Sequence, residues 1–422
     1  MKTRIIPHLF FLLLLVALYH MASAVNATGF RLPDQDAFAA ARGEAFVATA
    51  DNASAIYYNP AGIAQLQGHN VRVGTYALYL QSSYTSPDGR SFDNTEDLHA
   101  IPQLFYAFGH SELPLSLGVG LYSPYGLSSH WPDDTGFRTV ATEGILEYYT
   151  VNPVVAWRVS QSLSVGAGLT INYAELDLRK GLVWPTQPWD EFRFKGDGLD
   201  FGYNIGLLWK LHEKISFGAN FRSITTVDLD GRTEYFNAVE IPGVFPAFPK
   251  QRVEASAEFP FPFSAVLGVS YRPTPNWNFE FDAEYTDWNR LNTVVVKQAA
   301  SFSPLIPQNL PLVLDWEGSW YYEFGITRYI NDAWSISLGY IFNENSVPDK
   351  TYSPIVADLD RHFVSIGAGY ARDNFNIDLT YQFGYGPARK VSGSQASATG
   401  QTADGEYEFV SHALMVSIGL KF

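Results

Sequence analysis

Residues 163–173 have the sequence LSVGAGLTINY, in which apolar side chains occupy every odd position and small or polar side chains every even one. Side chains of a β-strand point alternately to the two faces of a sheet, so this segment predicts a strand with one apolar and one polar face. The same period of two recurs at 276–288, 334–342, 375–385 and 414–422. We therefore expect an all-β fold.

The lengths of the strands and of their connections separate a membrane barrel from a soluble sandwich. Many segments run for about ten residues or more, whereas soluble strands most often have about five or six and tilted membrane-spanning strands need about 9–11. We place six short polar turns at 110–114, 160–162, 212–214, 273–276, 331–333 and 372–374. We place seven longer loops near 81–98, 128–142, 181–197, 229–251, 291–317, 345–359 and 386–405.

These alternating connections join fourteen strands and predict a 14-stranded antiparallel transmembrane β-barrel of the outer membrane. Such a sheet has to close on itself, because backbone polar groups in lipid need internal partners. Aromatic side chains near strand ends suit the girdles of such barrels: Tyr76, Tyr79, Tyr148, Tyr149, Trp157, Tyr271, Trp288 and Tyr340. A secreted sandwich is the alternative.

The composition excludes several other classes of protein. The chain has 422 residues, a net charge of −15, no cysteine and a mean hydropathy of −0.07, and 15% of its residues are aromatic. Without cysteine there is no disulfide scaffold, thiol enzyme or Cys-built metal site. An acidic chain with no Lys- or Arg-rich run argues against nucleic acid as a partner, and the aromatic content argues against disorder.

Residues 1–24 have the three parts of a secretory signal peptide. A basic start precedes the apolar run Leu9–Leu18, and Ala22–Ala24 forms an A-x-A cleavage site. The alternative, a membrane anchor, would need a longer run to span about 30 Å as a helix. We expect export and cleavage that leaves Val25 at the N-terminus.

Residues 25–68 lack the alternation of the barrel at 69–422 and are rich in alanine. The segments 36–42 and 51–58 predict two short helices, and Pro60 marks an end. A compact segment ahead of a closed barrel fits inside the lumen as a hatch, or plug. The alternative, a disordered tail, would leave its apolar side chains exposed: Phe38, Phe46, Ile56, Tyr57, Ile63 and Leu66.

Several stretches of this chain resemble the FadL family of outer-membrane transporters for long-chain fatty acids and other hydrophobic compounds. The N-terminal ones are Gly29–Leu32 (GFRL), Ala41–Ala45 (ARGEA) and Asp51–Gly62 (DNASAIYYNPAG), of which the last is the most specific. Further ones are Tyr122–Leu127, Ser216–Ser223, Ala283–Trp288, Ser346–Asp349 and Asp358–Arg361. The resemblance thus extends over the whole mature chain.

The resemblance implies a monomeric barrel with a hatch and uptake by passive diffusion. The ligand is captured in a groove between extracellular loops, passes to a pocket against the hatch, and leaves sideways through a kinked third strand. By position, the kink corresponds to Ser123, Pro124, Tyr125 and Gly126. Pro has no N–H to donate and Gly weakens strand pairing, so a lateral gap is expected there, although an ordinary strand end with a turn is the alternative.

Other residues take expected roles from the same resemblance. Phe30 matches an aromatic residue that lines the inner pocket, and Asn59, Pro60 and Ala61 match the part of the hatch near the gap. Phe422 resembles the terminal aromatic residue that the barrel-assembly machinery reads during insertion into outer-membrane lipid.

The ligand's chemical class is left open by the sequence. Arg179 and Lys180 lie about where the family presents a basic residue to the ligand carboxylate, but residues 315–323 offer no second one. The long loops carry the aromatic residues expected to form the capture groove: Trp184, Trp189, Phe192, Phe245 and Phe248. Girdle aromatics are the alternative reading of these side chains. A fatty acid and an aromatic hydrocarbon are equally compatible ligands.

Catalytic, metal-binding and cofactor-binding motifs are not found. No His pair has zinc-ligand spacing and there is no G-x-S-x-G elbow, so we expect no enzyme activity and no cofactor. Glu280, Asp282 and Glu284 are expected to be three solvated carboxylates of the lumen. Two alternative functions stay open: a lipid-acting barrel enzyme, with His412 as its candidate residue, and a general porin.

Overall fold

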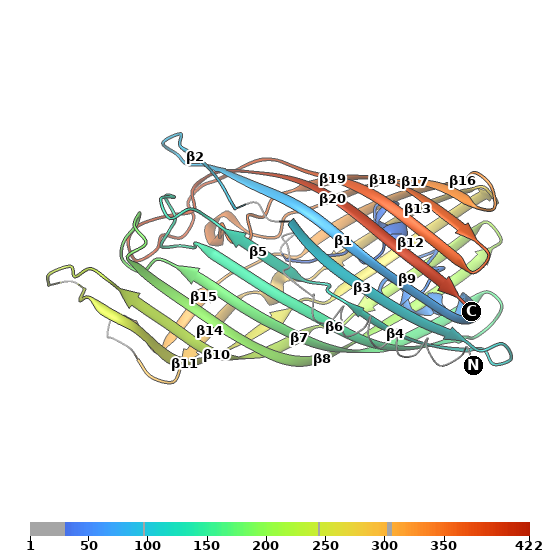
Figure 1. Cartoon of the computed structure of the whole chain (residues 1–422), viewed down its shortest axis with the longest axis horizontal. Helices are drawn as coiled ribbons and strands as arrows, with labels where there is room; N and C mark the ends of the chain where they lie inside the picture. The colour runs from blue at the N-terminus through green and yellow to red at the C-terminus, as the bar shows by residue number, and fades with distance from the viewer. Residues whose placement is uncertain (1–29, 96–97, 244, 302–305) are drawn as a thin grey trace, which may run out of the picture.

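The computed structural model describes residues 30–422 except 96–97, 244 and 302–305. Most of the described chain is β-strand, wound into one antiparallel barrel with long extensions at the end opposite the C-terminus (Figure 1). The predicted signal peptide, residues 1–24, lies outside the described residues. Within the described ranges, no helix is both long and apolar enough to cross a membrane.

The first strands of the sheet are β1 (Gly68–Thr85), β2 (Ser91–Asp93), β3 (Leu98–Gly109), β4 (Leu115–Tyr122), β5 (Gly126–His130), β6 (Glu143–Arg158), β7 (Leu163–Lys180), β8 (Asp190–His212), β9 (Ile215–Arg222) and β10 (Thr225–Asn237). The others are β11 (Phe248–Phe261), β12 (Ser264–Thr274), β13 (Trp277–Thr286), β14 (Thr293–Gln298), β15 (Asn309–Val313), β16 (Ser319–Tyr329), β17 (Trp334–Asn343), β18 (Arg361–Arg372), β19 (Phe375–Val391) and β20 (Gly405–Lys421). The short 3₁₀ helices η2 (Trp288–Arg290) and η3 (Asp349–Thr351) lie in connections.

The barrel closes because its last strand pairs with its first. β20 is antiparallel to β1 over a long register that begins with Asn70 opposite Lys421 and ends with Thr85 opposite Glu406. On its other edge β1 pairs with β3. The closed sheet has fourteen barrel strands, as the alternating turns and loops predicted. The alternative of a two-sheet sandwich is therefore excluded.

Five of the barrel strands are interrupted and consist of two segments each. The pairs of segments are β4 and β5, β9 and β10, β11 and β12, β13 and β14, and β15 and β16. The break at Ser123–Tyr125 was predicted, and the other four were not. The prediction that 229–251 and 291–317 are loops was wrong in part, because β10 continues to Asn237 and β14 and β15 lie within the second range.

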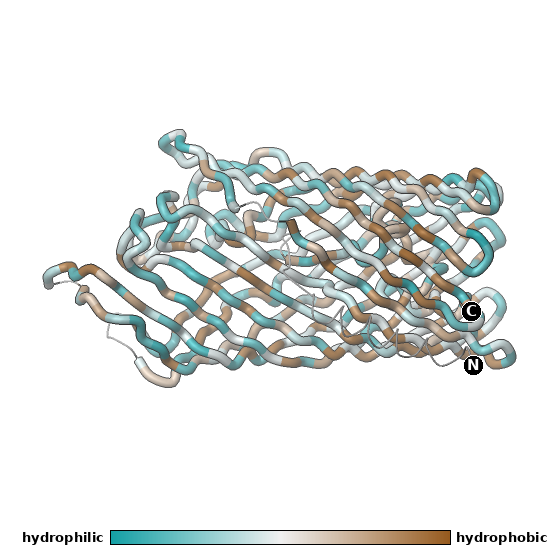
Figure 2. Tube along the Cα trace, in the orientation of Figure 1, coloured by the Kyte–Doolittle hydropathy of each residue, from teal (hydrophilic) through white to brown (hydrophobic). Residues whose placement is uncertain are grey.

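The alternation of the sequence has the predicted orientation in the half of the barrel that carries the short turns. In β7, Leu169 is 65% exposed and faces outward, whereas Thr170 and Asn172 are each 2% exposed and face the lumen. Figure 2 shows the resulting alternation of hydrophobic and hydrophilic residues along the strands and the hydrophilic turns at the end that holds the C-terminus. The outward apolar side chains form the surface that contacts lipid.

Residues 30–67 form the hatch and lie inside the lumen, with nearly all of their side chains buried. They contain α2 (Ala37–Ala40), α3 (Ala55–Tyr58) and the 3₁₀ helix η1 (Pro60–Gln65). Asp36 caps α2, because its side chain accepts hydrogen bonds from the backbone N–H groups of Phe38 and Ala39. The two short helices agree with the prediction, and the hatch is a folded plug and not an exposed tail.

Glycines of the barrel wall make room for the backbone of the hatch. A Cβ added to Gly339 of β17 would lie 1.9 Å from the backbone nitrogen of Gly43, and one added to Gly218 of β9 would lie 2.0 Å from the carbonyl oxygen of Val47. Gly166 likewise approaches the backbone of Pro60 and Ala61, and Gly206 approaches the side chains of Asn59 and Pro60. The small residues on the inner face therefore set how deeply the hatch can seat.

Two carboxylates of β13 hold the hatch by its backbone. Asp282 accepts hydrogen bonds from the N–H groups of Phe46 and Val47, both at 2.8 Å. Glu280 accepts from the N–H groups of Ala48 and Thr49, at 2.8 and 3.0 Å. Its second oxygen lies 2.6 Å from the guanidinium of Arg42. We call Glu280 and Asp282 the latch carboxylates.

The latch carboxylates correct one expectation. Glu280, Asp282 and Glu284 are 4%, 0% and 2% exposed, so they are not solvated lumen groups. Glu284 accepts a hydrogen bond from Arg31 of the hatch at 2.7 Å. Buried carboxylates need donors, and here backbone N–H groups and arginines of the hatch supply them.

Candidate functional site

Two connected cavities occupy the extracellular half of the barrel, above the hatch. The inner cavity has an empty volume of about 1130 Å³ and its lining includes Phe30, Leu127, Leu146, Leu176, Phe259 and Trp316. The outer cavity has an empty volume of about 1740 Å³ and its lining includes Leu178, Lys180, Phe192, Phe194, Phe245 and Leu310. Leu178 and Lys180 line both cavities, so they mark the boundary between them.

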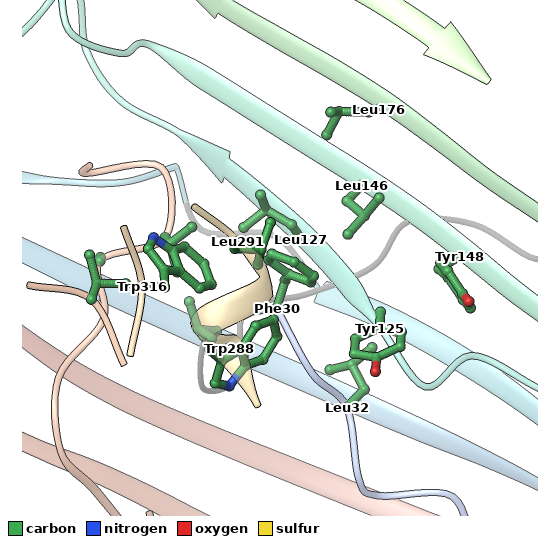
Figure 3. Close-up of a cluster of buried hydrophobic side chains, with 14 of the residues drawn as sticks. Phe30, Leu32, Tyr125, Leu127, Leu146, Tyr148, Leu176, Trp288, Leu291 and Trp316 are labelled. Carbon is green, nitrogen blue, oxygen red and sulfur yellow. The ribbon is translucent and has the colours of Figure 1, made fainter. Parts of the chain in front are cut away.

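Phe30 of the hatch lies at the centre of the aromatic wall of the inner cavity. Its ring centroid is 4.8 Å from that of Trp288, 5.5 Å from that of Trp316 and 5.8 Å from that of Phe259. Figure 3 shows Phe30 between these tryptophans and the aliphatic side chains of β5 and β6. A side chain of the hatch thus forms part of the lining of the inner cavity.

The third barrel strand is broken where the sequence predicted a kink. β4 ends at Tyr122 and β5 begins at Gly126, so Ser123, Pro124 and Tyr125 lie between the two segments. Within the described part of the chain, β3 pairs with β4 only from Leu104 to Gly109, and β5 pairs with no strand other than β6. The edges of β3 and β5 above the kink therefore lack their neighbouring strand.

The start of the hatch takes the place of this missing neighbour. The N–H of Gly126 donates to the carbonyl of Phe30 at 2.7 Å, and the N–H of Leu32 donates to the carbonyl of Pro124 at 2.8 Å. The side-chain amide of Gln35 donates to the carbonyl of Ser123 at 2.9 Å. We call Phe30–Gln35 the hatch arm. The arm thereby satisfies three backbone groups that the kink exposes.

Tyr125 of the kink points into the barrel. Its ring centroid is 6.0 Å from that of Phe30 and 5.0 Å from that of Tyr148, and its hydroxyl donates to the carbonyl of Pro262 at 3.2 Å. Pro262 lies in the break between β11 and β12. Two breaks in the barrel wall thus meet at the aromatic cluster below the inner cavity.

The other predicted hatch residues lie elsewhere. The side-chain amide of Asn59 donates to the carbonyls of Val47 at 2.7 Å and Leu207 at 3.0 Å. Pro60 and Ala61 pack against Gly166 of β7. These three residues hold the hatch to β7 and β8 and line neither cavity, whereas Phe30–Gln35 contact the kink.

The two predicted basic residues have different surroundings. The guanidinium of Arg179 is engaged in ion pairs with Glu143 at 2.9 Å and with Asp177 at 3.4 Å. The ammonium of Lys180 lies 5.8 Å from the ring centroid of Phe192, and the described residues supply it with no carboxylate within ion-pair distance. Lys180 is therefore the cation that remains available at the boundary between the cavities.

The predicted aromatic loop residues divide between the outer cavity and its surroundings. Phe192 and Phe245 line the outer cavity. Phe248 packs on Phe245, with ring centroids 5.6 Å apart, and Trp184 packs on Trp189 at 5.5 Å. The tryptophans and Phe248 support the loops that carry the lining residues.

Several lining residues were not predicted, among them Leu127, Phe259 and Trp316. The sequence around Leu176 and Leu178 contains a pattern from which such cavity-lining positions could have been predicted. From Leu163 to Tyr173 the apolar residues of β7 have odd numbers, and from Ala174 to Leu178 they have even numbers. The strand contains no bulge that would account for this shift. A change of parity within one strand means that the apolar face has moved from the outside of the barrel to the inside.

A family model described as outer membrane protein transport protein (OMPP1/FadL/TodX) matches residues 18–422. The long-chain fatty acid transport protein of Escherichia coli K12 is 22% identical over 416 residues, which cover 89% of each chain. The 47 kDa outer membrane protein of Pasteurella multocida is 23% identical, with 87% of this chain and 90% of that one covered.

Solved structures have the same fold. A Pseudomonas aeruginosa FadL homologue matches with a TM-score of 0.81 at 17% identity, over 93% of this chain and 100% of its own. The Pseudomonas putida toluene transporter TodX matches with a TM-score of 0.74 at 16% identity, over 94% of this chain and 100% of its own.

The matching family consists of outer-membrane transport proteins, so its members are transporters and not enzymes. The closed barrel and the outer-membrane relatives place this protein in the outer membrane of a Gram-negative bacterium. The alternative of a lipid-acting enzyme with His412 is therefore set aside. The match spans nearly the whole chain, and the protein belongs to the OMPP1/FadL/TodX family of outer-membrane transport proteins.

Proposed function

We propose that this protein takes up hydrophobic molecules by passive diffusion and releases them sideways into the membrane through the kink. A ligand enters the outer cavity between the extracellular loops, moves past Leu178 and Lys180 into the inner cavity, and displaces the hatch arm. The fatty-acid and toluene transporters among the similar proteins support a hydrophobic cargo. Two connected apolar cavities above a plugged lumen support the same path and argue against a general porin.

The observation that carries the proposal is that Phe30 belongs to both the cavity and the closure of the wall. Its ring packs in the aromatic wall of the inner cavity, and its carbonyl accepts the hydrogen bond from Gly126. A ligand that pushes the ring aside also pulls this carbonyl from the kink. Binding energy in the cavity thereby offsets the cost of opening the lateral gap.

A disulfide between the hatch arm and the kink tests this mechanism. Arg31 and Tyr125 form an antiparallel bridge, and directly opposed residues of such a bridge have the Cα separation that a disulfide needs. The chain has no cysteine of its own, so the pair Arg31→Cys and Tyr125→Cys is free of competing thiols. Oxidation should abolish uptake of a radiolabelled fatty acid by whole cells, and a reductant should restore it.

The two single-cysteine variants are the controls, because each removes one side chain and neither can close the crosslink. An oxidised double variant that takes up ligand as fast as its reduced form would show that the arm does not have to move. In that case release would need another route.

We propose further that a long-chain fatty acid is the preferred cargo, with its tail in the inner cavity and its carboxylate at Lys180. A cation without an ion-pair partner at the boundary of two apolar cavities is costly unless the ligand brings an anion. Lys180→Met should weaken binding of a fatty acid to the purified barrel by about tenfold and leave binding of an alkylbenzene unchanged. Arg179→Met is the matched control, because Arg179 is already paired with Glu143 and Asp177.

Equal loss of both ligands in Lys180→Met would point to a general packing role of this side chain. No loss of either would favour a neutral aromatic hydrocarbon as the cargo. Both results would leave the lateral path standing, because the disulfide experiment tests it separately.

The biogenesis of the protein adds three proposals. Residues 1–24 direct export and are removed, the barrel-assembly machinery reads Phe422, and the inserted barrel works as a monomer in outer-membrane lipid. Mass spectrometry of protein isolated from outer membranes should give an N-terminus at Val25, and native mass spectrometry should give one copy per particle.

A further inference from the structure

Four cations surround one buried carboxylate on the outer surface of the extracellular wall. The carboxylate is Glu234 of β10, and the cations are Arg193 of β8, Arg232 of β10, and Lys250 and Arg252 of β11. We call these four cations the cationic patch. β10 and β11 belong to the part of the wall that extends furthest from the C-terminal end of the barrel (Figure 1).

The distances show that the four cations converge on Glu234. The Glu234 carboxylate lies 2.9 Å from Nε of Arg232, 3.0 Å from Nε of Arg252 and 2.5 Å from Nζ of Lys250. Nη1 of Arg193 lies 3.8 Å away. The side chain of Glu234 is 2% exposed, whereas those of Arg232, Lys250 and Arg252 are 47%, 45% and 64% exposed. Three of the four cations are therefore open to solvent, whereas the carboxylate that they surround is not.

The patch faces outward, away from the outer cavity. On β8, Phe192 and Phe194 line that cavity, so Arg193 between them points to the other side of the sheet. The register places Arg193 and Arg252 directly opposite Glu234 on the two neighbouring strands. All of these side chains therefore share the outer face.

The height of the patch above the membrane follows from β8. Leu199 and Phe201 are 62% and 69% exposed and face outward, so they mark the upper part of the lipid-facing surface. Arg193 precedes Leu199 by six residues. Six residues of a strand span about 20 Å, which at the usual tilt of about 45° is about 14 Å along the membrane normal. The patch thus lies just above the headgroup boundary, at the level of the saccharides of an outer-leaflet glycolipid.

Acidic neighbours offset part of the charge of the patch but leave donors free. Asp177 pairs with Arg193 and is 6% exposed, and the exposed Glu254 lies opposite Arg232 on β11. Arg232 and Arg252 both reach Glu234 through Nε, and in the described part of the chain no hydrogen bond occupies their terminal Nη groups. Each guanidinium therefore presents its free edge to the outside. Such an edge matches the geometry of a phosphate.

We propose that the cationic patch binds the phosphate groups of the glycolipid in the outer leaflet of the outer membrane, that is, of lipopolysaccharide. Charge complementarity selects this partner, because a cluster of basic side chains beside a membrane surface attracts anionic headgroups. Glu234 keeps the four cations in place and lowers their mutual repulsion, so the site is preformed. The bound glycolipid would brace the outside of the wall whose inner face carries Phe192 and Phe194.

The test measures lipopolysaccharide that stays with the purified full-length barrel through a detergent wash. Arg232→Gln, Lys250→Gln and Arg252→Gln together should lower the affinity for purified lipopolysaccharide by about tenfold or more, because three phosphate contacts are lost. The matched control neutralises three exposed cations at the opposite end of the barrel: Lys214, Arg372 and Lys421. The control should bind like the natural protein.

Three further measurements make the outcome decisive. Dephosphorylated lipopolysaccharide should bind the natural protein no better than it binds the triple variant. Arg252→Gln alone keeps three cations on Glu234 and should lower the affinity by about threefold without loss of the folded barrel. Phosphatidylglycerol vesicles should not compete at equal phosphate concentration. Equal retention by the triple variant, or equal binding of the dephosphorylated glycolipid, would overturn the proposal.

Discussion

A single strand, β7, is built in opposite ways in its two halves. In the lower half, towards the short turns, Leu169 and Ile171 face outward and Thr170 and Asn172 face the lumen. In the upper half, towards the extracellular loops, Leu176 and Leu178 face the lumen, and Asp177 between them faces outward, where it pairs with Arg193. The apolar face of one continuous strand thus changes from the outside of the barrel to the inside.

This difference shows that the alternation of apolar and polar residues in a strand depends on what lies on each side of the barrel wall. The lower half has lipid outside and the folded hatch inside, and the upper half has water outside and apolar cavities inside. The contacts differ too. The hatch is held by directed hydrogen bonds to Glu280 and Asp282, whereas the cavities are lined by aromatic and aliphatic surface. A plug held by directed hydrogen bonds and an open apolar path share one wall.

The largest expected effect comes from a change that breaks the lower half alone. Gly339→Val would place Cβ 1.9 Å from the nitrogen of Gly43, and overlap with backbone should cost about 3 kcal/mol or more. The hatch should no longer seat, while the strand keeps its ladder. We expect single-channel recordings to show steady ion conductance through the unplugged barrel.

Leu338→Val is the control for this change, because Leu338 is 51% exposed on the lipid side of the same strand. It should leave the barrel closed. A closed Gly339→Val barrel would mean that the hatch can shift without leaving the lumen.

A smaller effect is expected from removal of one latch carboxylate. Glu280→Ala leaves the guanidinium of Arg42 without its partner and two backbone N–H groups without acceptors. Leaving these buried donors without acceptors should weaken hatch docking by about 1–3 kcal/mol. Hydrogen exchange at residues 46–49 should become faster by a matching factor, while Glu258→Ala on the exposed outer surface should change nothing. Unchanged exchange at these amides would contradict a latch role.

The upper half is tested by Phe30→Ala, which enlarges the inner cavity and removes its central aromatic ring. Binding of a fatty acid to the purified barrel should weaken by about tenfold, as expected when one aromatic contact is lost. Phe38→Ala also truncates a hatch aromatic, but one that packs on Phe46 and lies away from the cavity. It should leave the affinity unchanged, and equal losses in both variants would mean that hatch stability and not cavity contact controls binding.

The smallest expected effect is a pH dependence of hatch docking. Burial, together with the negative charge of Asp34, raises the pKa of Glu44 well above its usual value. Burial also raises the pKa of Asp34. A carboxyl group whose pKa is higher in the docked hatch contributes stability below the pKa of the free group, about 4, and this contribution is lost as the pH rises through the docked pKa.

The protection of hatch amides from hydrogen exchange, relative to the intrinsic base-catalysed rate at each pH, should therefore fall as the pH rises above about 4. Glu44→Gln should flatten this dependence and slow the exchange at neutral pH. A pH profile that is the same in both proteins would show that Glu44 does not control docking.

The lower half of the barrel was predictable because its pattern depends on local alternation. Strand order, closure and the short helices of the hatch follow from period, turn length and the signals that end a helix. The kink at Ser123–Gly126 was placed by the resemblance to the family, which the proline within a strand supports. The upper half was partly hidden, because its apolar residues face inward and its outward face is charged. Segments such as Phe248–Phe261 therefore resemble polar loops when a lipid-facing side is expected.

The roles of Glu280 and Asp282 could not be predicted from local pattern at all. Their partners lie more than 230 residues earlier in the chain, at Phe46 to Thr49. In the sequence, three acidic residues on the polar face of a strand form the same pattern whether they face water or the hatch. Only the closed barrel brings the two regions together.

This separation in sequence has a consequence for the order of folding. The hatch is synthesised first, but its acceptors on β13 and the wall glycine of β17 arrive near the end of the chain. Contacts between residues so far apart are slow to form and require the intervening chain to be ordered first. The carboxylates and the wall glycine that seat the hatch thus become available only after most of the sheet has been made. The contacts that hold the plug can therefore form only late in assembly.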